Sequence, residues 1–122
     1  MKFYFCETCN SIFNFIKAPN QELECCGKPL KELVPNSTNA SLEKHVPIIE
    51  RMDSHVEIKV GAEPHPMLPE HYIEWVVLET NYGYQLKNLH PGDAPTASFA
   101  LSKGEEVLCA YAYCNIHKLW KS

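Results

Sequence analysis

The chain has 122 residues, of which 45% are hydrophobic and 21% are charged, and its formal net charge is −4. This composition excludes an intrinsically disordered chain, and the negative charge argues against non-specific binding of nucleic acid. No apolar run approaches the roughly 20 residues of a membrane-spanning helix, so we expect no membrane partner.

The N-terminus carries a short apolar stretch, Phe3–Phe5, that ends at Cys6. It is too short for the apolar region of a secretory signal, so we expect the protein in the cytoplasm. The chain also contains six cysteines and six histidines. Because disulfides are uncommon in a reducing compartment, these residues indicate metal binding.

A polar stretch, Val34–Ala40, contains Pro, Asn and Ser and predicts a linker. It divides the chain into a domain of residues 1–36 and a domain of residues 37–122. The first piece is shorter than the ~40 residues at which a hydrophobic core normally suffices without a staple. It holds four of the six cysteines, so we expect short hairpins folded around a bound ion.

These four cysteines have a spacing typical of a metal site. Cys6 and Cys9 form a C-x-x-C turn, and the adjacent pair Cys25 and Cys26 follows after 15 residues. Four thiolates make a soft tetrahedral site for iron or zinc, and the spacing does not distinguish the two metals. The adjacent pair predicts a distorted tetrahedron. A redox dithiol at Cys6 and Cys9 is a weaker interpretation, because it leaves Cys25 and Cys26 unexplained.

The second piece has the pattern of short β-strands. In His55–Val60 every second residue is apolar, which is the period of a half-buried strand. We predict a hairpin turn at Ser102–Glu105 between the last two strands. No helical period is sustained, and the pattern favours an antiparallel β-sandwich. The other predicted strands are Tyr72–Thr80, Tyr84–Leu89, Ala97–Leu101 and Glu106–Tyr113.

A second set of metal-binding residue types lies in this piece. His45, His65 and His71 stand at segment edges beside proline or acidic residues, where a loop can aim the ring. Cys114 and His117 are three positions apart at the end of the last predicted strand, so they converge if the chain turns there.

The remaining histidines and cysteine have simpler explanations. We expect His55 and His90 to be exposed or hydrogen-bonded without a metal. Cys109 falls inside a predicted strand, and we expect it to be a small buried apolar side chain.

In a set of short segments the chain resembles the desulfoferrodoxin family, the two-iron form of superoxide reductase. These segments are CETC and CC in the first piece, and EKHVP, HPM, EHYIEW and CNIHKLW in the second. The resemblance covers essentially the whole chain. It implies a desulforedoxin-like domain followed by an immunoglobulin-like β-sandwich. Asn10 stands where glycine is common in the family, and asparagine tolerates the left-handed backbone better than most residues.

The resemblance also implies a role for each candidate site residue. One iron, or zinc in its place, would be bound by Cys6, Cys9, Cys25 and Cys26. A second iron would have four equatorial imidazoles, His45, His65, His71 and His117, and the axial thiolate of Cys114. Its sixth position would be open to superoxide, with Lys44 above it, and Glu43 would occupy it in the ferric state. The implied enzyme reduces superoxide to hydrogen peroxide, takes electrons from rubredoxin or a similar donor, and works as a homodimer.

The chemistry of these residue types agrees with that assignment. Four neutral imidazoles and one thiolate leave a ferrous ion with a net charge of about +1, which suits an anionic substrate. We expect the backbone N–H groups of Ile116 and His117 to point at the Cys114 sulfur and to moderate its electron donation. Two alternatives stay open: a non-catalytic electron carrier that works through the four-cysteine iron, and a zinc-stapled interaction module.

Overall fold

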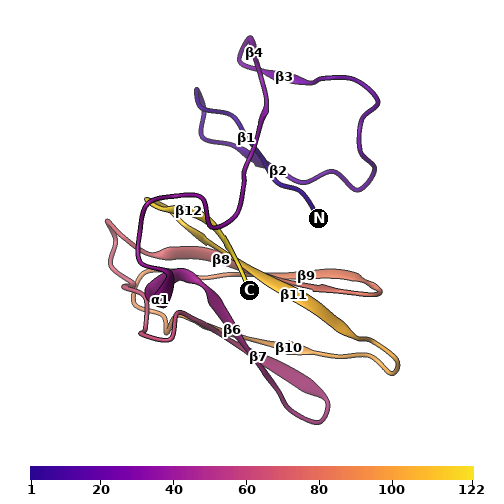
Figure 1. Ribbon diagram of the computed structural model, residues 1–122, viewed down its shortest axis with the longest axis vertical. Coiled ribbons are helices and arrows are strands. Elements are labelled where there is room, and N and C mark those ends of the chain that lie inside the picture. Colours follow the sequence, from indigo (N-terminus) through magenta and orange to yellow (C-terminus); the bar gives the residue numbers. More distant parts are fainter. The chain divides into compact units, whose positions relative to one another are not determined.

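The computed structural model describes residues 1–122 and divides them into two compact units, Met1–Val34 and Pro35–Ser122 (Figure 1). The N-terminal unit, Met1–Val34, has strands of two residues each. A three-stranded antiparallel sheet has the order β2-β1-β5, and a separate hairpin pairs β3 with β4. The bounds are β1 Tyr4–Phe5, β2 Ile12–Phe13, β3 Glu24–Cys25, β4 Lys28–Pro29 and β5 Lys31–Glu32.

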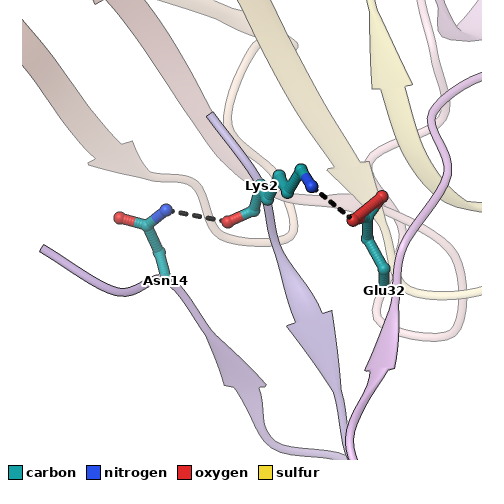
Figure 2. Close-up of polar contacts among 3 residues, drawn as sticks. All are labelled: Lys2, Asn14 and Glu32. Carbon is teal, nitrogen blue, oxygen red and sulfur yellow. Dashed lines mark hydrogen bonds and ion pairs between the residues drawn. The ribbon is translucent and has the colours of Figure 1, made fainter. Parts of the chain in front are cut away.

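The N-terminal unit has almost no hydrophobic core, since its buried residues are Phe3 and Cys6. Polar contacts tie its three-stranded sheet together, as Figure 2 shows. Lys2 Nζ lies 3.4 Å from Glu32 Oε1, and the Asn14 side-chain amide donates to the Lys2 carbonyl at 2.9 Å. Exposed ion pairs contribute only about 0–1 kcal/mol, so these contacts do not replace a core.

The second unit, Pro35–Ser122, is an antiparallel β-sandwich, and the predicted fold class is confirmed. One sheet has the order β10-β7-β6 and the other has the order β12-β11-β8-β9 (Figure 1). The strands are β6 Pro47–Arg51, β7 His55–Val60, β8 Ile73–Thr80, β9 Gly83–Asn88, β10 Thr96–Ala100, β11 Val107–Cys114 and β12 Lys118–Lys121.

The inward faces of the two sheets form one hydrophobic core. Alternating residues of β7, Val56, Ile58 and Val60, are fully buried, as the period of two requires. They pack with apolar residues of the other sheet, and the cluster extends to Cys114 at the end of β11. The core therefore supports one of the predicted metal-binding residues directly.

The predicted hairpin at Ser102–Glu105 needs correction. The turn at Ser102–Glu105 forms, with the Glu105 amide donating to the Ser102 carbonyl at 3.0 Å. It is not a hairpin, because β10 pairs with β7 and β11 pairs with β8 and β12. A turn signal shows that the chain reverses but not which strand becomes the hydrogen-bonding partner.

The predictions also lack β6, β12 and a four-residue helix, α1, Leu42–His45. Helix α1 ends at His45, since Val46 precedes Pro47 and proline disfavours the helical conformation of the residue before it. At four residues, α1 is far from the length that would cross a bilayer, and no other helix is present.

Candidate metal centres

The four cysteines of the N-terminal unit form a thiolate cluster. The sulfur atoms of Cys6, Cys9, Cys25 and Cys26 all lie within 4.8 Å of one another, and none is in a disulfide. Cys25 Sγ lies 3.6 Å from Cys9 Sγ and 3.9 Å from Cys26 Sγ. Four sulfurs at about 2.3 Å from a common ion in a tetrahedron are about 3.8 Å apart. The spacing therefore fits a single tetrahedral metal ion.

Two left-handed residues shape the loops of this thiolate cluster. Asn10 has φ 62°, and its backbone N–H donates to the Cys6 carbonyl at 2.9 Å, which closes the C-x-x-C turn. The expectation that asparagine serves in place of glycine here is confirmed. Cys26 has φ 54°, and it is followed by Gly27 at φ 76°. This tight turn lets two adjacent cysteines face the same point.

The thiols of the cluster influence one another. Hydrogen bonding to the Ser11 side chain, whose oxygen lies 3.1 Å from Cys9 Sγ, lowers the pKa of Cys9 to about 6. The neighbouring thiols of Cys6 and Cys9 raise the pKa of Cys25 to about 12. Four thiolates so close together need a compensating cation, because their charges otherwise repel.

The second unit contains a histidine cluster, made of the imidazoles of His45, His65, His71 and His117 with the thiol of Cys114. His45 Nε2 lies 3.2 Å from His65 Nε2 and 3.1 Å from His117 Nδ1. Two nitrogens bound at a right angle to one ion, each at about 2.1 Å, are about 3.0 Å apart. The His71 ring centre lies 4.7 Å from that of His65 and 5.2 Å from that of His117.

Two of these rings turn their lone pairs toward each other. His45 Nδ1 lies 2.6 Å from the Ser41 carbonyl, and His65 Nδ1 lies 2.7 Å from the Pro66 carbonyl. A carbonyl only accepts hydrogen bonds, so both Nδ1 atoms carry the proton and both Nε2 atoms are bare in the neutral rings. Bare nitrogens 3.2 Å apart repel, and a cation between them removes the repulsion.

His71 and the Cys114 sulfur face the same point as these two rings. His71 Nε2 is buried and has no hydrogen-bond partner, which is costly unless a metal binds it. The nitrogens of His45, His65 and His71 and the sulfur of Cys114 lie within 4.8 Å of one another, and Cys114 Sγ lies 3.8 Å from His117 Nδ1. Five donors thus converge, one more than a closed structural zinc site uses.

The Cys114 sulfur has the backbone environment that the sequence predicted. The His117 amide donates to it at 3.3 Å, and the Ile116 amide also hydrogen-bonds to it. Burial raises the pKa of the Cys114 thiol, and the two amides oppose this by stabilising the thiolate.

Two further residues, which were not predicted from the sequence, support the histidine cluster. Trp120 is fully buried, stacks on His45 with ring centres 4.6 Å apart, and donates its indole N–H to the His117 carbonyl at 3.1 Å. Gly61, at φ +86°, lies against α1, and a Cβ there would be 2.6 Å from the Lys44 carbonyl. Motif spacing could have suggested Trp120, within CNIHKLW, but not the close approach at Gly61.

The other candidate residues lie as follows. Glu43 and Lys44 are exposed on α1, immediately before the buried ring of His45. His55 and His90 stand outside the cluster, beside Glu57 at 3.6 Å and Asp93 at 3.5 Å, as predicted. Cys109 is only partly buried, and its thiol donates to Glu79 at 3.4 Å, so it is more polar in environment than predicted.

Acid should destabilise the metal-free protein. Burial lowers the pKa of His45, of His71 and of His65, the last to about 4. Below the ordinary histidine pKa of about 6.5 the unfolded chain binds more protons than the folded one, so the free energy of unfolding decreases as the pH falls from about 6.5 toward 4. Urea unfolding at pH 7.5, 5.5 and 4.5 measures this. In a His65→Gln variant the free energy of unfolding should decrease less with falling pH, whereas His55→Gln should behave like the parent. An equal pH dependence in all three proteins would contradict this prediction.

Comparison with known proteins identifies relatives of the whole chain. A family model described as desulfoferrodoxin matches residues 37–122. The desulfoferrodoxin homolog of Archaeoglobus fulgidus is 42% identical over 122 residues, which cover 100% of this chain and 96% of that protein. The desulfoferrodoxin of Nitratidesulfovibrio vulgaris is 39% identical, over 98% of this chain and 93% of that protein.

Solved structures of superoxide reductases are similar to all or part of the chain. The superoxide reductase from Treponema pallidum superposes with a TM-score of 0.83 at 35% sequence identity, covering 100% of this chain and 99% of that one. The one-iron superoxide reductase from Giardia intestinalis has a TM-score of 0.57 at 35% identity and covers 66% of this chain and 95% of that one.

Proposed function

Because the chain belongs to the desulfoferrodoxin family, we propose that it is a superoxide reductase, which reduces superoxide to hydrogen peroxide at a non-haem iron bound by the histidine cluster. The observation that supports this most strongly is the convergence of four imidazoles and one thiolate on a single point. Five donors would leave a bound iron able to take one further small ligand, as a catalytic site requires.

In this proposal each site residue has a definite task. His45, His65, His71 and His117 hold the iron as neutral ligands, and Cys114 holds it as a thiolate. A ferrous ion held there would supply one electron to superoxide, which with two protons from water becomes hydrogen peroxide. Amide hydrogen bonds from Ile116 and His117 reduce the electron density that the Cys114 sulfur donates.

The two exposed residues of α1 act on the substrate side. Lys44 attracts the superoxide anion and offsets the negative net charge of the chain locally. Glu43 would occupy the free position of the oxidised ion and so keep other ligands out. Their exposed positions on α1, directly before His45, support these two roles.

The thiolate cluster has a separate task. We propose that residues 1–36 form a desulforedoxin-like domain, in which Cys6, Cys9, Cys25 and Cys26 bind an iron, or zinc, whose main role is to hold the domain together. Residues 37–122 form the catalytic domain. Rubredoxin or a similar protein returns an electron to the oxidised site, and the chain works as a homodimer. The cytoplasm suits it, because its six free cysteines would stay reduced there.

Stopped-flow mixing of the reduced two-iron protein with superoxide tests the function. We expect one hydrogen peroxide for each superoxide consumed and no dioxygen. Release of one dioxygen for every two superoxides would show a dismutase instead. If superoxide did not react, the non-catalytic electron carrier would be the better interpretation. A protein that binds zinc alone at both sites would also contradict the proposal.

Removal of the Lys44 charge should slow the reaction with superoxide. In Lys44→Ile we expect the second-order rate constant to fall about tenfold or more and its dependence on ionic strength to weaken, because local positive potential raises association rates by ~10–10³-fold. Lys103→Ile, at an exposed lysine in the Ser102–Glu105 turn, changes the net charge equally and should keep the rate. Equal rates and salt slopes in the two variants would refute steering by Lys44.

A further inference from the structure

The four imidazoles of the histidine cluster are not anchored alike. The rings of His45 and His65 are fixed by hydrogen bonds from Nδ1 to the Ser41 and Pro66 carbonyls. His117 is fixed through its main chain, which bonds to Trp120 and to the Cys114 sulfur. No hydrogen bond holds the His71 ring, whose buried Nε2 has no partner. The position of His71 therefore depends on its backbone.

That backbone is bound on both sides of His71 by one side chain, Asn115. The Asn115 amide group donates from Nδ2 to the Glu70 carbonyl at 3.1 Å and accepts at Oδ1 from the Tyr72 N–H at 3.0 Å. Its own backbone N–H donates to the Tyr72 carbonyl at 3.2 Å. Beyond these bonds, His71 pairs only with Leu68, through two backbone hydrogen bonds of 3.0 Å.

Asn115 also lies at the other half of the site. It follows Cys114 directly and precedes His117 by two positions, in the turn between β11 and β12. The loop that carries His71 and the turn that carries Cys114 and His117 are thus joined through one carboxamide. A carboxamide has a donor and an acceptor on one short side chain. It can therefore bind the Glu70 carbonyl and the Tyr72 N–H group, which are two residues apart.

We infer that Asn115 is a positioning residue of the histidine cluster, which sets His71 at the correct place relative to Cys114 and His117. It touches neither superoxide nor metal. This inference rests on the proposed iron site but not on the reaction that occurs there. Outer groups that orient a metal ligand change metal affinity by about 10–100-fold when they are removed.

The test uses Asn115→Leu, which keeps the size and removes both side-chain hydrogen bonds. We expect the affinity of the histidine cluster for ferrous iron to fall about 10–100-fold in the full two-iron protein. Competition with a chelator measures this affinity. We also expect a changed electron paramagnetic resonance signal of the ferric form. Asn115→Asp keeps the acceptor for Tyr72 and loses the donor, so its loss of affinity should be intermediate.

A matched control exists in the same unit. Asn81 makes the same kind of clamp, donating to the Gly104 carbonyl at 3.1 Å and accepting from the Glu106 N–H at 2.7 Å, in the turn between β8 and β9. Asn81→Leu should lower the free energy of unfolding of the metal-free protein, and leave iron affinity and the resonance signal unchanged.

Two outcomes would overturn the inference: iron affinity and signal in Asn115→Leu that equal the parent, or losses that are equal in Asn115→Leu and Asn81→Leu. If Asn115→Leu does not fold, Asn115→Asp decides by the same comparison. A parent protein that binds iron in the second site but does not reduce superoxide would refute the proposed function alone, because iron affinity and the ferric signal are measured without superoxide.

Discussion

Replacement of Cys114 by serine should abolish superoxide reduction. The thiolate is the only sulfur donor among the five converging groups, and it is fully buried at the end of β11. Removing a direct ligand should cost more than the 10–100-fold in metal affinity that is typical of outer residues, so we expect a loss of more than about 100-fold. The metal content should fall from two ions per chain to about one. The thiolate-to-ferric absorption band of the histidine cluster should disappear, while that of the four-cysteine site remains.

Cys109→Ser is the control for this experiment. Cys109 lies on the same strand, β11, but outside both clusters, and its thiol bonds to Glu79. This variant should keep two metal ions per chain, the absorption band and the rate. If Cys114→Ser also kept its band and its rate, the assignment of Cys114 as a metal ligand would be wrong.

Replacement of Cys9 by serine should unfold the N-terminal unit and spare the activity. The buried residues of this unit are Phe3 and Cys6, so we expect a metal held by the thiolate cluster to be its main source of stability. Metal bound at structural sites contributes roughly 10–16 kcal/mol in small zinc domains. We expect proteolysis within Met1–Val34 to accelerate on the order of 10²-fold or more. The rate with superoxide should stay within about twofold.

The ion pair of Figure 2 supplies the matched control. Glu32→Ala removes the contact with Lys2, which is worth about 0–1 kcal/mol at the surface, so proteolysis of this unit should change little. A large loss of superoxide reduction in Cys9→Ser, with the second iron retained, would show that the thiolate cluster conducts electrons to the active site and is not only structural.

Local patterns predicted the parts of the fold that have clear periods. The strand His55–Val60 was predicted to the residue because its apolar positions alternate without interruption. Strand β6 begins with proline and places Ile48 next to Ile49, which hides the alternation, and β12 has only four residues. The partner of each strand depends on packing across the sandwich, and for this reason the predicted hairpin between β10 and β11 was wrong.

The candidate sites show the same division. Residue types and spacing predicted which side chains have metal-binding chemistry, and the family resemblance grouped them. Distance in the chain hides how they meet, since His45 and His117 are 72 positions apart and their nitrogens lie 3.1 Å apart. The supports at Gly61 and Asn115 depend on close approaches between loops, which no local pattern encodes.

The two units differ in how much of their structure exists before a metal arrives. The sandwich buries a continuous apolar core from Val56 to Cys114 without any ion, whereas the N-terminal unit buries two residues. During biosynthesis, we therefore expect the second unit to fold before it binds metal, and the first to need its ion in order to fold. When metal is scarce, newly made chains would then carry a folded histidine cluster, ready to bind an ion, attached to a segment exposed to degradation.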